Sequence, residues 1–129
     1  MININRLQEK EIRKILEFKD DNENVEAIVI KNPNKKVRDE FIEVMTTKSD
    51  NEYYQIEYLM KELTNIELSK PLNEFLKNDY INPIFNDLLK ELSSILFELV
   101  KELSLTLEVE TEMDEAESLL LKQIKNDIQ

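Results

Sequence analysis

The stretch of sequence that decides the fold is IFNDLLKELSSILFELVKEL, residues 84–103. Its apolar residues recur at spacings of three and four, which is the period of an amphipathic α-helix. Two series repeat every seven positions: Phe85, Leu92 and Leu99, and Leu89, Leu96 and Leu103. Together they form a face broader than the seam of a two-stranded coiled coil. We therefore expect a long helix that begins at Ile84.

Asn-Pro pairs mark two positions at which helices are expected to begin. Pro fits the first helical turn and Asn can cap it, and the pair occurs at Asn32-Pro33 and Asn82-Pro83. Further helices are expected over residues 52–66 and just after Pro71. A first helix is expected after Asn5, on a stripe of apolar residues: Leu7, Ile12, Ile15, Leu16 and Phe18.

Two segments are expected to form β-strands. Residues 25–30 are short and rich in β-branched side chains, and residues 105–110 alternate apolar and polar side chains with period two. An isolated strand is not stable, so we expect these two strands to pair with each other. A polar turn over residues 20–24 precedes the first strand, and a last helix over about 111–128 follows the second.

These elements predict a mainly α fold with a small two-stranded β element. A chain of 129 residues has room for one domain, so we expect a single-domain bundle of four to six helices over residues 1–129. The segment over about 108–129 is acidic, and we expect it to be solvated or mobile. It lacks the central Gly and the alternating Asp and Asn of a calcium loop. An electrostatic lure for a basic partner helix is an alternative role for it.

Missing residue types argue against catalysis and against a cofactor. The chain has no Gly, which excludes a P-loop and a dinucleotide-binding turn. It has no Cys, so disulfides and thiolate metal sites are excluded. Without His, the commonest general base and transition-metal ligand are also missing. We predict a non-enzymatic protein with no catalytic, cofactor-binding or metal-binding residues.

The charge indicates the class of partner. A net charge of −11 opposes nucleic-acid binding, because neutralising phosphates needs an excess of Lys and Arg. It favours solubility and basic protein partners. The apolar stretches are too short for a signal peptide or a membrane span, so we expect a cytoplasmic protein. A basic cluster is interpreted as solvated surface balancing acidic residues elsewhere, or as a contact for an acidic partner: Lys31, Lys35, Lys36 and Arg38.

Two groups of side chains are candidates for binding a protein partner. Tyr54 and Tyr58 share a helix face at spacing i, i+4, where they form either the edge of the core or an anchor for a partner. The long helix can offer part of its apolar stripe to a partner helix where the core does not use it. The candidates on the long helix are Leu96, Leu99, Val100 and Leu103.

The order of elements resembles the tail assembly chaperones of long-tailed bacteriophages and prophages of low-GC Gram-positive bacteria. The matching pieces are IVIKNP (residues 28–33), YLMKELTNIE (residues 58–67), the helix over 84–103 and the acidic segment after it. The resemblance covers about two-thirds of the chain, and its contact residues are not carried over individually.

This resemblance implies a role in binding proteins. Such chaperones bind the long, helical tape measure protein and keep it soluble until tube subunits polymerise around it. Many have a frameshifted longer form that contacts the tail tube protein, and this chain would correspond to the short form in the host cytoplasm. The alternatives are an acidic inhibitor or nucleic-acid mimic that binds a basic host protein, and a helical homo-oligomer assembled through the stripe over 85–103.

Overall fold

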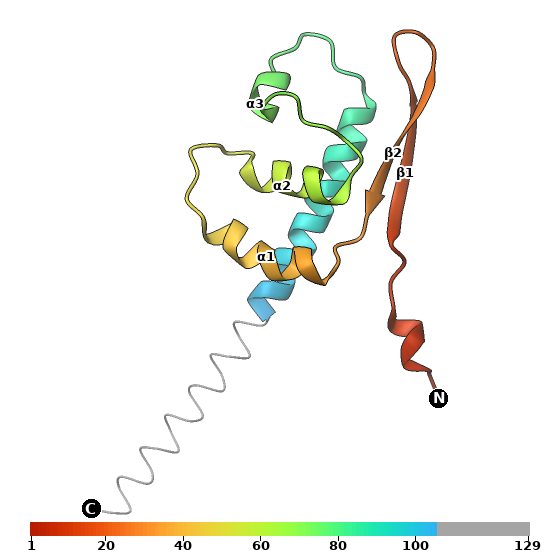
Figure 1. The fold of residues 1–129 in the computed structure, drawn as a ribbon, viewed down its shortest axis with the longest axis vertical. Helices are drawn as coiled ribbons and strands as arrows, with labels where there is room; N and C mark the ends of the chain where they lie inside the picture. Colours follow the sequence, from red (N-terminus) through yellow and green to blue (C-terminus); the bar gives the residue numbers. More distant parts are fainter. Residues whose placement is uncertain (106–129) are drawn as a thin grey trace, which may run out of the picture. The chain divides into compact units, whose positions relative to one another are not determined.

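The computed structural model describes residues 1–105 and contains a β-hairpin and several helices (Figure 1). Residues 1–97 form one compact unit, and a second unit begins at Glu98. A helix that carries no label in Figure 1 extends from residue 84 to residue 105, and we call it the long helix. The labelled elements are β1 (Ile12–Lys19), β2 (Val25–Lys31), α1 (Lys35–Thr46), α2 (Tyr54–Leu63) and α3 (Leu72–Phe75), and a short 3-10 helix without a label, η1 (Ile4–Leu7), precedes them.

The hairpin is closed by the polar turn that the sequence predicts over residues 20–24. Asp20 organises this turn, because its Oδ1 accepts hydrogen bonds from the backbone N–H groups of Asn22 (2.8 Å) and Asn24 (2.9 Å). Glu23 takes a left-handed backbone conformation with φ of 63°, which costs more for a residue with a Cβ than for Gly. The Asp20 carboxylate offsets that cost by satisfying the backbone donors of the turn.

The helix expected after Asn5 is wrong, because β1 occupies most of that segment. Leu16 faces the core and is 6% exposed, whereas Ile15 lies on the outer face and is 52% exposed. A bulge near Arg13 shifts the alternation of the strand. The bulge and the outward Ile15 produce apolar spacings that imitate a helix. Pairing with β2 decides the conformation, because it gives the backbone of β1 its hydrogen-bond partners.

The predicted strand over 25–30 is confirmed as β2, but the partner predicted for it is wrong. β2 pairs antiparallel with β1, with Leu16 opposite Ile28 and Ile15 opposite Val29. Leu105 belongs to the long helix, and residues 106–110 lie outside the described part of the chain, as does the last helix expected over about 111–128. The partner strand of β2 is therefore β1, which ends 86 residues before Leu105, and not a strand after the long helix.

The other edge of β2 is covered by the residues that follow α2. Ile30 forms an antiparallel bridge with Thr64. The side-chain amide of Asn65 acts like a short third strand, because its Oδ1 accepts from Val29 N (3.0 Å) and its Nδ2 donates to Ala27 O (3.0 Å). These contacts satisfy backbone groups that an open sheet edge would leave to water or to another chain.

The predicted helices over residues 52–66, after Pro71 and from residue 84 are confirmed. The helix after Asn32-Pro33 is also present, with Asn34 as its cap, since Asn34 Oδ1 accepts from Val37 N at 3.0 Å. Within residues 1–105 the fold is therefore four α-helices and a two-stranded antiparallel sheet, not a bundle of helices alone. None of these helices is both long enough and apolar enough to cross a membrane.

The core of residues 1–97 lies between the inner face of the hairpin and the apolar faces of the helices. Each element contributes at its own period: alternate residues from the strands, and residues three or four apart from the helices. The most deeply buried side chains, none more than 2% exposed, are Ile30, Val37, Phe41, Leu59, Met60, Leu63, Leu72, Leu88, Leu92 and Ile95.

Candidate binding pocket

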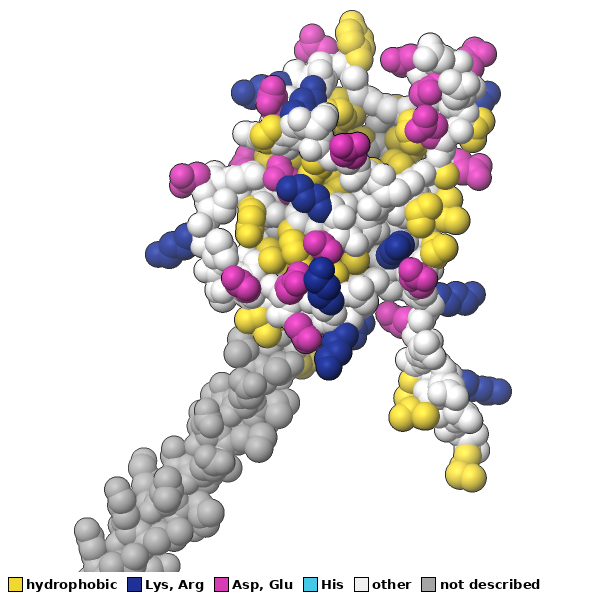
Figure 2. All heavy atoms as spheres, in the orientation of Figure 1, with side chains coloured by type: hydrophobic (Ala, Val, Ile, Leu, Met, Phe, Trp, Pro, Cys, Tyr) yellow, Lys and Arg dark blue, Asp and Glu magenta, His cyan; other side chains and the backbone are white. Residues whose placement is uncertain are grey.

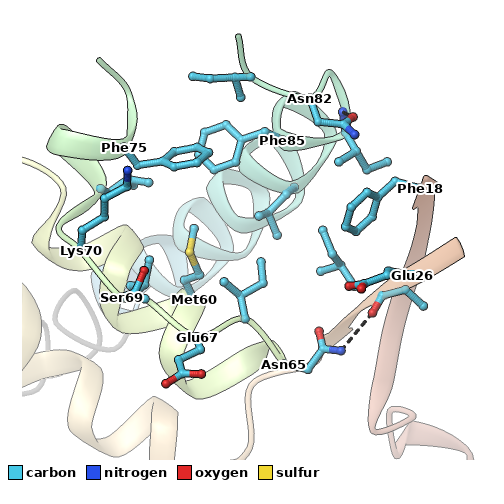
Figure 3. A pocket seen from close by; sticks show the side chains of 18 residues that line it. Phe18, Glu26, Met60, Asn65, Glu67, Ser69, Lys70, Phe75, Asn82 and Phe85 are labelled. Carbon is cyan, nitrogen blue, oxygen red and sulfur yellow. Dashed lines mark hydrogen bonds between the residues drawn. The ribbon is translucent and has the colours of Figure 1, made fainter. Parts of the chain in front are cut away.

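An open pocket of about 550 Å³ lies among the hairpin, the segment between α2 and α3, α3, and the start of the long helix (Figure 3). Its volume falls within the range of about 300–1,000 Å³ typical of binding sites in proteins. All the residues that line it belong to the compact unit of residues 1–97. The pocket therefore depends on the packing of that unit alone.

Three phenylalanines from separate elements give the pocket an apolar wall. Phe75 of α3 and Phe85 of the long helix contact each other, with ring centroids 5.0 Å apart and planes tilted by 53°. In such a tilted arrangement the electrostatic interaction between the two rings is favourable. Phe18 projects from β1 across from this pair, and Met60 of α2 lies below Phe75 in Figure 3. Their arrangement leaves apolar surface accessible to a ligand.

Polar side chains surround this apolar surface. Asn65 holds the edge of β2, and Asn82 Nδ2 donates to Lys19 O at 3.3 Å. Lys70 lies over the ring of Phe75, with Nζ 5.9 Å from the ring centroid, a favourable cation–π distance. Glu26 and Glu67 are exposed carboxylates that line the pocket. The pocket thus combines an apolar wall with a rim that can pair with a basic group.

Glu57 of α2 fixes the position of α3 beside the pocket. Its Oε1 accepts a hydrogen bond from Leu72 N at 2.7 Å, at the start of α3, and its Oε2 accepts one from Asn51 Nδ2 at 2.9 Å. A carboxylate satisfies unpaired N–H groups at a helix start and is favoured there by the helix dipole. This contact anchors the short helix that presents Phe75 to the pocket.

At the end of the hairpin away from its turn, charged groups close the contact between β1 and the long helix. Arg13 Nε lies 3.0 Å from Glu91 Oε2, and Lys14 Nζ lies 3.4 Å from Glu91 Oε1. The hydrogen bond from Arg13, supported by Lys14, holds the pKa of the Glu91 carboxyl below its usual range. This site joins strand to helix through an ion pair, with no pocket residue among its members.

The basic cluster predicted around the start of α1 pairs with acidic residues nearby. Lys31 Nζ lies 3.5 Å from Glu11, and Arg38 lies 3.7 Å from Glu9. These contacts support the interpretation that the cluster balances acidic residues of the same fold. Lys35 and Lys36 are exposed.

The six residues predicted to contact a partner do not line this pocket. Tyr54, Tyr58 and Leu96 are half-buried, Leu99 is 4% exposed, and Val100 and Leu103 are half-buried. Tyr58 donates a hydrogen bond to Glu40 on α1 at 2.9 Å. Its burial and this bond raise the pKa of the phenol above its usual range. Tyr58 therefore joins α1 to α2 in this structure.

Sequence reasoning missed the pocket because its walls come from elements far apart in the chain. The sequence pattern places Phe18 on the apolar stripe of a helix and Phe85 on the apolar face of the long helix, and it places Phe75 within the separate helix after Pro71. The sequence did contain one usable signal. Pro71 and Pro83 place the starts of two helices only twelve residues apart, so Phe75 and Phe85, each near the start of its helix, can lie close together. Within residues 1–105, no group of three or more acidic, His or Cys side chains is placed to hold a metal ion.

A scan against protein-family models found no match to this chain, and searches of curated proteins and of solved structures found none either.

Proposed function

We propose that this chain is a non-enzymatic binding protein whose pocket receives an apolar segment of a client protein. The observation that carries the proposal is the open wall formed by Phe18, Phe75 and Phe85 with the acidic residues Glu26 and Glu67 at its rim. Aromatic side chains around a concave surface are typical of sites that anchor a partner's side chains. The two carboxylates outnumber the single cation of the pocket, Lys70, and this excess favours a segment that carries a basic residue.

The client that best fits the sequence is a long helical protein kept soluble during assembly. The resemblance to phage tail assembly chaperones suggests the tape measure protein as this client, with the tail tube protein as a second partner. An amphipathic helix docks by inserting apolar side chains spaced three or four residues apart into such a pocket. The exposed charged surface of the chain, with net charge −11, would keep the complex in solution.

Co-expression with the products of adjacent genes tests this proposal. We expect affinity purification to recover a long helical protein that is insoluble when expressed alone. Phe85→Asp places a charge in the apolar wall and should lower the recovered amount at least tenfold. The matched control is Ile15→Asp, which adds the same charge on the exposed outer face of β1.

Two results would overturn the proposal. Equal recovery with both variants would show that the client binds elsewhere. Recovery of a basic host enzyme that acts on nucleic acid, in place of a helical client, would favour the acidic inhibitor. Circular dichroism of each variant establishes that the comparison is made between folded proteins.

A further inference from the structure

The amino-terminal segment over residues 1–8 exposes a series of large apolar side chains. Ile2, Ile4 and Leu7 are 74–78% exposed, and η1 has no buried residue. Figure 2 shows this segment projecting from the hairpin with its apolar atoms uncovered. Soluble proteins seldom expose clustered apolar side chains unless something binds them. We call residues 1–8 the arm.

The arm and the pocket carry opposite charge, and both present apolar side chains. It contains Arg6 and no acidic residue, in a chain whose net charge is −11. Arg13 and Arg38 form ion pairs within the described part of the chain, and no ion pair of Arg6 is found there. The pocket offers an apolar wall lined also by two carboxylates, Glu26 and Glu67, and by one cation, Lys70, so that acidic groups are in excess. The pocket is therefore chemically suited to the arm: its apolar wall suits the apolar side chains, and its carboxylates suit Arg6.

The start of β1 is held in place, which limits where the arm of the same chain can reach. Asn32 binds the carbonyl oxygens of Lys10 (2.7 Å) and Glu11 (2.9 Å). Phe18, in the pocket, lies eight residues along the chain from Lys10, which is about 26 Å at the rise of a strand. Ile4 lies six residues before Lys10, so even a fully extended chain carries it only about 20 Å. Ile4 therefore falls short of Phe18 of its own chain.

The limited reach of the arm within its own chain does not apply to the pocket of a second copy of the protein. The arm leaves the hairpin at one end, and the pocket includes Phe18 and Glu26, close to the turn at the other end. Two hairpins related by a two-fold axis and aligned antiparallel bring each arm next to the other copy's pocket. A two-fold arrangement fills both pockets and leaves no arm free.

We propose that the arm of one copy occupies the pocket of a second copy, in a reciprocal dimer. Ile4 and Leu7 insert into the apolar wall, and Arg6 pairs with Glu26 and Glu67. The inference rests on the proposed function in one respect, since the arm would then compete with the client for the same pocket. At a concentration where about nine in ten pockets hold an arm, the apparent Kd for the client rises about tenfold.

Charge reversal with rescue tests the dimer, using light scattering on the full-length chain. The wild type is expected at twice the 15.4 kDa of one chain. Arg6→Glu, and separately the pair Glu26→Lys with Glu67→Lys, should each give the mass of one chain. Combining all three substitutions should restore the dimer. Lys10→Glu and Glu17→Lys are the matched controls, because both side chains are exposed and neither belongs to the arm or the pocket.

Other results separate the arm from the client. A wild-type mass of one chain at high concentration would overturn the dimer, including the case in which the arm reaches its own pocket. A dimer that persists after both charge reversals would also overturn it, and would place the contact elsewhere. In either case, loss of client with Phe85→Asp would leave the proposed function standing. If the masses follow the expected pattern but no client is recovered, the reciprocal dimer is supported and the proposed client-binding function is not.

Discussion

The hairpin meets the helices in two different ways along its length. Near the start of β1 the contact is closed: Ile30 is fully buried, and Arg13 and Lys14 bind Glu91 of the long helix. Near the turn the contact is open, because Phe18 and Glu26 line a pocket in which apolar surface stays accessible.

This difference shows how one small sheet can serve both stability and binding. The closed end gains from complete burial and from paired charges, so its side chains are fixed by their neighbours. The open end leaves apolar area uncovered, which costs stability but offers a partner a favourable contact. Substitutions at the two ends should therefore differ in their effects on folding.

The largest expected effect compares two isoleucines truncated to alanine. Ile30→Ala at the closed end should lower the free energy of unfolding by about 2–5 kcal/mol, because it removes fully buried methyl groups and leaves a cavity. Ile81→Ala, a half-buried pocket residue, should cost about 1 kcal/mol or less. Urea unfolding measures both. Equal losses would show that the pocket end is as tightly packed as the closed end.

The ion pair at the closed end should make stability depend on pH. Glu91→Gln should cost about 1 kcal/mol at pH 7, since the pair is partly exposed. The lowered pKa of Glu91 means that its stabilising effect is complete above the ordinary carboxyl value of 4.5 and is lost as pH falls through the lower pKa of the folded state. Unfolding of both proteins at pH 7 and pH 3 should therefore show a difference that shrinks in acid.

A matched substitution separates this effect from general acid sensitivity. Glu17→Gln removes an exposed carboxylate on the outer face of β1 and should leave the free energy of unfolding nearly unchanged at both pH values. A difference between wild type and Glu91→Gln that stays constant from pH 7 to pH 3 would contradict the role assigned to this ion pair.

A smaller effect is expected where Asn65 covers the edge of β2. Asn65→Ala removes two hydrogen bonds to Val29 and Ala27, and should cost about 0.5–1 kcal/mol because water can replace them at this exposed position. Amide hydrogen exchange at Val29 should accelerate more than exchange at Leu92 in the long helix. Unchanged exchange at Val29 would mean that the Asn65 amide does not protect this edge.

The smallest effect is expected at the contact between α1 and α2. Tyr58→Phe removes the hydrogen bond to Glu40 and should cost about 0.5 kcal/mol, within the range of a single partly buried bond. The raised pKa of Tyr58 predicts that one of the four tyrosines resists ionisation in an alkaline absorbance titration. That late step should be missing in Tyr58→Phe, and its persistence would assign it to another tyrosine.

Local patterns were sufficient for the helices and for one strand. The period of apolar residues from Ile84 onward predicted the long helix, and Pro71 marked the start of α3 correctly. The β-branched residues of β2 predicted a strand because such side chains favour the extended conformation. These predictions depend on neighbours within a few residues, which is the range over which intrinsic preferences act.

The sequence by itself determined the helical period of the long helix, the start of α3, the turn over 20–24 and the lack of His, Cys and Gly chemistry. The tertiary structure decided the rest. β1 became a strand because β2 supplied its hydrogen-bond partners, despite apolar spacings that suit a helix. The pocket exists because Phe18, Phe75 and Phe85 come together from three elements. Such contacts between distant segments follow from chain packing, which local periodicity does not encode.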